Sequence, residues 1–219
     1  MGSLHPDGGP DRFISEHAGF VLAEGEDGKT RRVGKVHTHR VHARLAARHG
    51  EPLFDVCDAH SQALHEVHAL FYEPGQYHFR EPLIDRFDAT DCDCLVVDYV
   101  VLHPRWRGLR LGLLAVRKLI DLLGGGCGLA VSEVLPLNPD AHDLLAVPPS
   151  WLPGFDTKEA RRGAVRKLRR HFRQVGFERV GRTAFYALPL AGRRPPWPTC
   201  CGRRRGPAGV RADRPPRVA

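Results

Sequence analysis

The segment HPRWRGLRLG (residues 103–112) combines the residue types that hold phosphate groups. It follows the apolar run LVVDYVVL and opens the periodic run LRLGLLAVRKLIDLL, so we expect a turn from a buried strand into a helix. The first backbone amides of such a helix have no partners within it and lie at the positive end of its dipole. Gly108 would let a ligand approach the backbone, and Arg105, Arg107 and Arg110 would add positive charge. The sequence therefore predicts an anion-binding turn here.

Two single acidic residues interrupt otherwise apolar strands, and either could remove a proton from a substrate. Asp98 lies within CDCLVVDYVVL (92–102), and Glu133 lies within the following strand, CGLAVSEVLPL (127–137). Burial disfavours a charged carboxylate, so we expect a raised pKa, which suits a base that works near neutral pH. In the alternative interpretation, each side chain points out of the sheet or pairs with an arginine.

The elements around these residues alternate in a way that predicts an α/β fold. Two strands (17–25 and 30–41) joined by the Asp-Gly turn of EDGK come first, followed by two helices (43–50, and 58–72 with Asp58 as its N-cap). The central strand 92–102 leads into a helix at 108–123, which we expect the glycines 124–126 to end, because glycine reaches the left-handed conformation of a helix C-cap at little cost. A strand (127–137), a loop (138–156), a helix (157–175) and two short strands (176–190) follow.

Charge and composition separate a central domain from two ends. Residues 189–219 hold eight arginines and one aspartate, which accounts for +7 of the formal net charge of +8. We predict a flexible N-terminus at 1–12, a folded domain at 13–190 and a disordered Arg/Pro-rich tail at 191–219. No apolar run reaches the roughly 18 residues that a membrane helix needs, and the N-terminus does not resemble a signal peptide. We therefore expect a cytoplasmic protein with no membrane partner.

Histidines cluster in VHTHRVH (36–42), but their spacing alone does not predict a metal site. His37 and His39 alternate along a strand and would share one face, yet no acidic or cysteine partner stands nearby at ligand spacing. The six cysteines likewise form no CxxC pair. A solvated strand face is the favoured interpretation, and we expect no bound metal.

The loop is similar to the acyl-CoA pyrophosphate loop of the GCN5-related N-acetyltransferase (GNAT) superfamily. That loop has the form [RQ]xxGx[GA] after a strand, and LHPRWRGLRLG supplies Pro104, the pair Arg107 and Gly108, and Gly112. Arg110 stands where the family has its middle glycine. The segment HFRQVGFERV also resembles the late YxxxGF segment of the family, and the order of elements over the folded domain matches the GNAT order.

This resemblance implies a GNAT-like mixed, mostly antiparallel central sheet flanked by helices. It implies transfer of an acetyl group from acetyl-CoA to a primary amine by direct attack, with Asp98 or Glu133 taking the amine proton. The backbone of Val100, Val101 and Leu102 would pair with the pantetheine arm. The pyrophosphate would be held by the amides of Arg107, Gly108, Leu109, Arg110, Leu111 and Gly112.

Other interpretations stay open at this stage. The family's usual proton donor, a tyrosine, falls at Phe172, for which His171 or Tyr99 would have to substitute. The chain could be a catalytically degenerate GNAT-fold module that binds CoA or serves in interactions. It could also be a nucleic-acid-associated protein that uses the basic helix 157–175 and the tail, whose arginines could bind nucleic acid non-specifically through counterion release. We expect a monomer or homodimer, and the sequence does not identify the amine acceptor.

Overall fold

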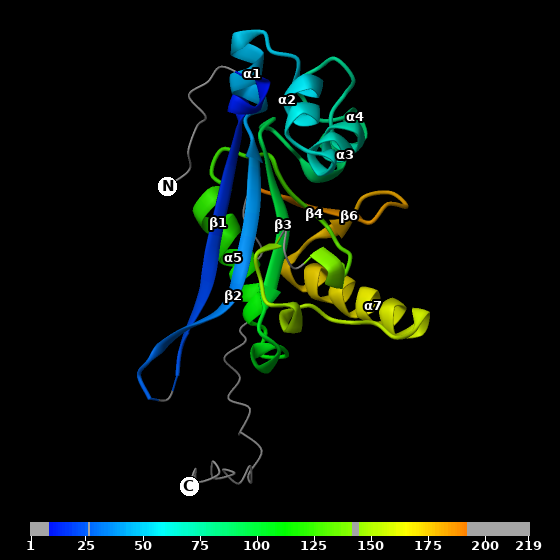
Figure 1. Cartoon of the computed structure of the whole chain (residues 1–219). Helices are drawn as coiled ribbons and strands as arrows, with labels where there is room; N and C mark the ends of the chain where they lie inside the picture. The colour runs from blue at the N-terminus through cyan, green and yellow to red at the C-terminus, as the bar shows by residue number, and fades with distance from the viewer. Residues whose placement is uncertain (1–8, 26, 142–144, 192–219) are drawn as a thin grey trace, which may run out of the picture.

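The sheet at the centre of the protein has six strands in the order β1-β2-β3-β4-β6-β5, according to a computed structural model that describes residues 9–25, 27–141 and 145–191 (Figure 1). The strands are β1 Ile14–Glu24, β2 Thr30–Val41, β3 Cys94–Leu102, β4 Leu129–Glu133, β5 Glu178–Arg179 and β6 Phe185–Pro189. Only β3 and β4 run parallel; the other neighbouring strands in the described sheet are antiparallel. The predicted mixed α/β sheet is therefore confirmed.

Helices lie in the connections between β2 and β3, between β3 and β4, and between β4 and β5. Their bounds are α1 Ala43–His49, α2 Leu53–His60, α3 Gln62–Phe71, α4 Glu81–Phe87, α5 Leu111–Leu123 and α7 Lys158–Val175. The prediction of one helix at 58–72 is wrong, because Ser61 is extended and its hydroxyl caps α3 by accepting the Leu64 amide at 3.3 Å. Asp58 consequently lies inside α2 and caps nothing. None of the helices in the described ranges is long and apolar enough to cross a membrane.

Several predicted boundaries also move. Helix α5 begins at Leu111, not 108, and it ends at Gly124 in a right-handed conformation (φ −82°); the left-handed residue of this glycine run is Gly126 (φ +73°). Strand β4 ends at Glu133 instead of continuing to 137. At the N-terminus, a short 3₁₀ helix at Pro10–Phe13 replaces part of the expected flexible segment. Residues 1–8 of that segment, and the tail beyond residue 191, lie outside the described residues.

The two faces of the sheet are covered by different helices. Because strand side chains alternate, Cys94 and Val96 of β3 face the cluster built with α1 to α4, which gather at the end where β1 begins (Figure 1). Leu95, between them, faces the opposite cluster, which α5 and α7 supply with Ile120 and Val175. A smaller cluster covers Val101 near the far end of β3 and comes from the segment 137–152.

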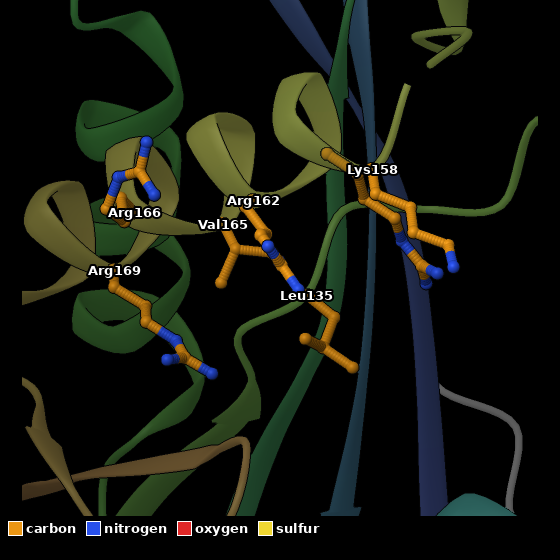
Figure 2. Close-up of a pocket in the computed structure, with 7 residues that line it drawn as sticks. Leu135, Lys158, Arg162, Val165, Arg166 and Arg169 are labelled. Carbon is orange, nitrogen blue, oxygen red and sulfur yellow. The ribbon is translucent and has the colours of Figure 1, made fainter. Parts of the chain in front are cut away.

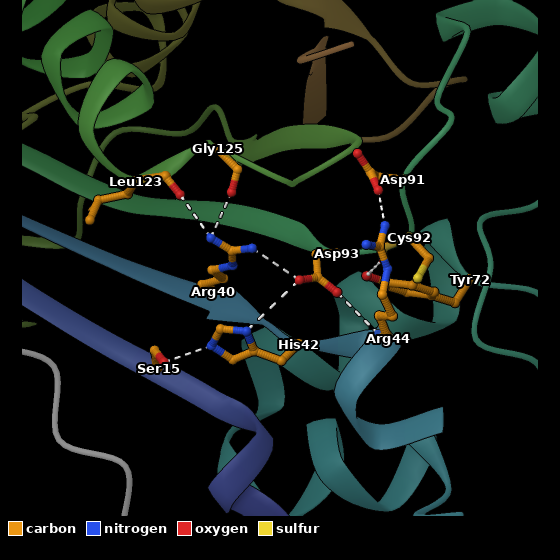
Figure 3. Close-up of polar contacts among 10 residues, drawn as sticks. All are labelled: Ser15, Arg40, His42, Arg44, Tyr72, Asp91, Cys92, Asp93, Leu123 and Gly125. Atoms are coloured by element: carbon orange, nitrogen blue, oxygen red, sulfur yellow. Dashed lines mark hydrogen bonds and ion pairs between the residues drawn. The ribbon is translucent and has the colours of Figure 1, made fainter. Parts of the chain in front are cut away.

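A buried carboxylate joins the strands to the helices at the start of β3 (Figure 3). Asp93 is 7% exposed; its Oδ2 accepts a hydrogen bond from Arg40 Nη2 at 3.0 Å, and its Oδ1 accepts the backbone amide of Arg44, in the first turn of α1, at 3.1 Å. Arg40 of β2 also donates from Nη1 to the carbonyl of Gly125, just after α5, at 2.8 Å. One aspartate and one arginine therefore tie together β2, β3, α1 and α5.

Replacing Asp93 by asparagine is expected to lower the free energy of unfolding by about 3 kcal/mol, because the guanidinium of Arg40 would be left without its buried counter-charge. Urea denaturation followed by circular dichroism measures this change. Asp91→Asn is the matched control: Asp91 pairs with Arg44 on the surface, where such a pair contributes about 1 kcal/mol or less. Equal losses in the two variants would contradict the structural role given to Asp93.

Candidate functional site

The central feature of the candidate site is the point at which the two parallel strands separate. β3 and β4 pair over three positions, of which the last is Val96 with Val131. β3 then continues to Leu102 paired with β2, while β4 continues to Glu133 paired with β6. The edge of β3 that faces β4 therefore has no strand partner beyond Val96 within the described residues. Val100, Val101 and Leu102, the residues expected to meet a pantetheine arm, lie on this open stretch.

A β-bulge at Asp98 coincides with the separation. Val97 pairs with Thr38 and Tyr99 pairs with His37, so Asp98 is an extra residue in β3. A bulge increases the local twist of a strand and redirects the side chain at the extra position. β3 borders the gap that opens between β3 and β4, and it is therefore bent at Asp98, which the sequence predicts as a candidate base.

The loop between β3 and α5 presents several backbone amides without a partner, but the amide of Arg107, which the sequence also predicts to be available, donates to the Pro104 carbonyl at 3.1 Å. Residues Pro104–Trp106 form a 3₁₀ turn, and Gly108 follows with φ +78°. The amides of Gly108, Leu109, Leu111 and Gly112 form no hydrogen bond within the described residues, and the first bond into α5 runs from the Leu114 amide to the Arg110 carbonyl at 3.1 Å. A Cβ added at Gly108 would meet no atom within 4 Å, so the space beside this backbone is open.

Two arginines of the loop have structural roles that the sequence does not reveal. Arg107 turns back onto the protein, donating from Nε to the Leu102 carbonyl at 3.1 Å and from Nη2 to the Trp151 carbonyl, so its side chain braces the loop. Arg110 has a left-handed backbone (φ +61°) directly before α5. Glycine adopts the left-handed conformation at the lowest energetic cost of any residue. A loop with this backbone would therefore favour glycine at the position of Arg110.

A basic cavity of about 460 Å³ lies against α7, at the end of β4 (Figure 2). Its walls are Leu135, two residues beyond β4, and a row of α7 side chains: Lys158, Arg161, Arg162, Val165, Arg166 and Arg169. Helix α7 also packs with α5 in one hydrophobic cluster, and this packing brings the helix near the loop that precedes α5. Helix α7 therefore forms one wall of a positively charged cavity.

Asp98 is paired with two histidines. The sequence suggests pairing as one alternative for this residue, but with an arginine as the partner. Its Oδ2 lies 2.9 Å from Nδ1 of His37 and 2.8 Å from Nδ1 of His39. Burial favours a higher pKa for Asp98, but the contacts with these two rings outweigh it and lower the pKa. The expectation of a raised pKa at Asp98 is therefore wrong.

Glu133 behaves as expected for a base. It lies at the exposed end of β4, where loss of solvent and the nearby negative charge of Glu66 on α3 raise its pKa. Along β4 it alternates with Leu129 and Val131, so it points to the sheet face covered by α1 to α4. Asp98 belongs to the same face through its contact with His37 and His39, and the structure thus brings both candidate acids to one face of the sheet, on the two strands that border the gap.

The residue at the family's tyrosine position packs into the core. The ring of Phe172 lies 5.1 Å from that of Phe177, with the planes nearly perpendicular, in the cluster beneath α5 and α7. His171 is no substitute, because burial and the charges of Lys167, Arg170 and Arg110 lower its pKa and leave less of it protonated. Tyr99 stacks on His37 at 5.3 Å, with a pKa raised by burial and by Asp98.

The histidine pair is not on a solvated strand face, because His39 is 8% exposed and His37 is held between two carboxylates. The second carboxylate is Glu16 of β1, whose Oε1 lies 2.6 Å from His37 Nε2. Glu16 lies outside the expected strand 17–25, whereas β1 begins at Ile14, and a bulge between Val21 and Leu22 also shifts the pairing of β1 with β2. The hairpin turn was the available signal, but its register without the bulge would place Glu16 opposite Thr38 and on the other face.

No protein-family model matches the chain, and no curated protein or solved structure matches it significantly. The GNAT resemblance of the loop and of the element order thus remains a prediction, and the geometry above carries the functional argument.

The left-handed backbone at Arg110 gives a prediction for stability. Arg110→Gly is expected to have a free energy of unfolding about 1 kcal/mol higher than Arg110→Ala, because both remove the same side chain but only alanine is strained at φ +61°. At Lys118, inside α5, the order should reverse, with alanine about 1 kcal/mol above glycine. Thermal and urea denaturation of the four variants measure both differences; the same order at the two positions would contradict the assigned backbone.

Proposed function

We propose that the protein is an N-acyltransferase that moves an acetyl group from acetyl-CoA to a primary amine. The observation that carries this proposal is the separation of β3 and β4 directly beside the loop whose Gly108, Leu109, Leu111 and Gly112 amides form no hydrogen bond within the described residues. A strand edge without a neighbouring strand can hydrogen-bond the amide groups in the pantetheine arm of CoA. A helix N-terminus can bind the pyrophosphate of CoA. These two features in succession match the extended shape and the charge of an acyl-CoA.

The basic cavity supports the same ligand. CoA carries a 3′-phosphate in addition to its pyrophosphate, and a second cationic surface near the loop would hold it. Lys158, Arg162 and Arg166 lie along one wall of the cavity on α7. Arginine forks bind phosphate oxygens in pairs, which makes this wall suitable for a terminal phosphate.

The amine would approach from the face that carries Asp98 and Glu133. Of the two, Glu133 is the better general base, because its raised pKa gives it more affinity for a proton and it lies at the open end of β4. Asp98 is engaged by two histidines with a lowered pKa, so we assign it to orienting His37 and His39 on the acceptor side.

The reaction follows from these positions. Glu133 takes a proton from the ammonium group, and the free amine attacks the thioester carbonyl to form the new C–N bond. The nitrogen of the tetrahedral intermediate still carries a second proton from the amine, and this proton passes to water as the C–S bond breaks. CoA leaves as a thiolate and takes a proton from water, because Phe172 has none to give. A thiolate leaves readily, so the lack of a tyrosine at this place slows the reaction without preventing it.

A second candidate function has one observation in its favour. It is a module that binds CoA without catalysis. Phe172, at the family's tyrosine position, is packed into the core and offers no proton to a leaving thiolate. Release of free thiol that depends on an added amine separates the two functions. CoA binding without such release under any amine in an acceptor screen would favour the binding module.

CoA binding is predicted to depend on the cavity wall of α7. Arg162→Glu is expected to weaken CoA about tenfold in calorimetry, because it places a negative charge where the 3′-phosphate would bind. Arg173→Glu makes the same charge change on the same helix outside the cavity, and less than about a threefold effect is expected there. Dephospho-CoA should bind the wild-type protein more weakly than CoA does. Absence of CoA binding, or equal losses in both variants, would count against the proposed donor site.

The acid limb of the pH–rate profile is predicted to report Glu133. A general base works deprotonated, so the rate should fall as pH drops through the pKa of Glu133, which lies above the usual 4.5 of a glutamate. Glu133→Gln should reduce kcat/KM by about 100-fold or more and abolish this limb. Glu66→Gln removes a like charge, so it should shift the limb to lower pH while the plateau rate is kept. A limb unchanged in both variants would exclude Glu133 as the base.

A further inference from the structure

We propose that Glu16, His37 and His39 form a binding site for a divalent transition metal, with Zn²⁺ as the ion that their chemistry fits best. One ligand atom from each of these three side chains lies within 4.8 Å of the others, close enough for a single ion to reach all three after small rotations. His37 and His39 lie on the acceptor side of the reaction proposed above, but the binding of a metal by these three side chains does not depend on that reaction.

The backbone fixes the three side chains on one face of the sheet. Glu16 of β1 is directly opposite His39 of β2 in the antiparallel register, and His37 lies two residues away on the same strand and the same side. A pair of bonded strands holds such residues without any loop, so little conformational freedom would be lost when an ion binds.

Asp98 supplies the support that metal-binding histidines usually have. The same oxygen, Oδ2, lies 2.9 Å from Nδ1 of His37 and 2.8 Å from Nδ1 of His39. With Nδ1 of His37 engaged there, its Nε2 is the nitrogen directed at Glu16, 2.6 Å from Oε1. A carboxylate behind the histidine rings fixes their orientation and increases the electron density that they offer to a metal.

His60 adds a further nitrogen at the edge of the group. Its ring lies 4.6 Å from the ring of His39 in a perpendicular arrangement, and its buried Nδ1 has no hydrogen-bond partner within the described residues. A buried nitrogen without a partner is costly, and a nearby ion or an ion-bound water would offset that cost. Glu16 is exposed over 59% of its side chain, so solvent reaches the site from the side of β1.

The donor set selects the class of metal. Two imidazoles and one carboxylate are typical of zinc and related transition metals, whereas Mg²⁺ and Ca²⁺ prefer oxygen ligands alone. Glu16 and Asp98 together carry two negative charges, which would balance a divalent cation in a partly buried place. The three protein ligands leave at least one position open for water or another small ligand.

Titration of the metal-free full-length protein with Co²⁺, which replaces Zn²⁺ and absorbs visible light, tests the proposal. One Co²⁺ per chain is expected to bind with the visible absorption of a four- or five-coordinate nitrogen and oxygen site, and Zn²⁺ should displace it. His37→Ala and His39→Ala should each weaken Co²⁺ binding at least tenfold, and Asp98→Asn by about 10- to 100-fold.

His65→Ala is the matched control, because His65 also lies 2.8 Å from a carboxylate, that of Asp58, but on the helical surface away from the group. Its Co²⁺ affinity should equal that of the wild-type protein. Glu16→Gln preserves size and exposure, so it tests the site even if a histidine variant fails to fold, which melting of the metal-free proteins reveals. Wild-type protein that binds no Co²⁺, variants that bind as the wild type does, or an intense near-ultraviolet band from cysteine ligation would each overturn the proposal.

Discussion

The pairing of β3 with β4 ends after Val96, and the arrangement of the candidate site depends on where it ends. Each strand has a second neighbour that it follows outward, β2 for β3 and β6 for β4, so separation costs neither strand its other ladder of hydrogen bonds. The bulge at Asp98 adds twist at the same place. An opening in the middle of the sheet is stable here because each strand that borders it stays hydrogen-bonded to its other neighbour.

The two faces of the sheet give this opening two different approaches. On one side α5 and α7 bring the amide-rich loop and the arginines of α7, and on the other the strands carry Asp98 and Glu133. Asp93 and Arg40 hold the opposite end of the sheet closed through buried hydrogen bonds. In the proposed reaction, a polyanionic donor and a cationic acceptor would therefore meet at the gap without competing for the same surface.

The sequence predicts the parts of this protein that local pattern determines. The apolar run before residue 103, the glycines of the loop and the helical pattern of residues 157–175 each act within a few residues, and the corresponding strand and helices are present. What the sequence could not predict depends on distant pairing. Asp98 contacts His37 across 61 positions of the chain, and Glu16 reaches that group only through a one-residue bulge in the hairpin. Side-chain patterns do not encode such register shifts.

Arg110 has a consequence for how loops of this kind are recognised. Its residue type departs from the glycine-based pattern, yet its left-handed backbone is the conformation that glycine would supply there. An arginine adopts that conformation at a modest energetic cost, which the packing of α5 and the surrounding loop offsets. The loop is therefore defined by a succession of backbone dihedral angles, and a consensus of residue letters is only one of the ways to encode it.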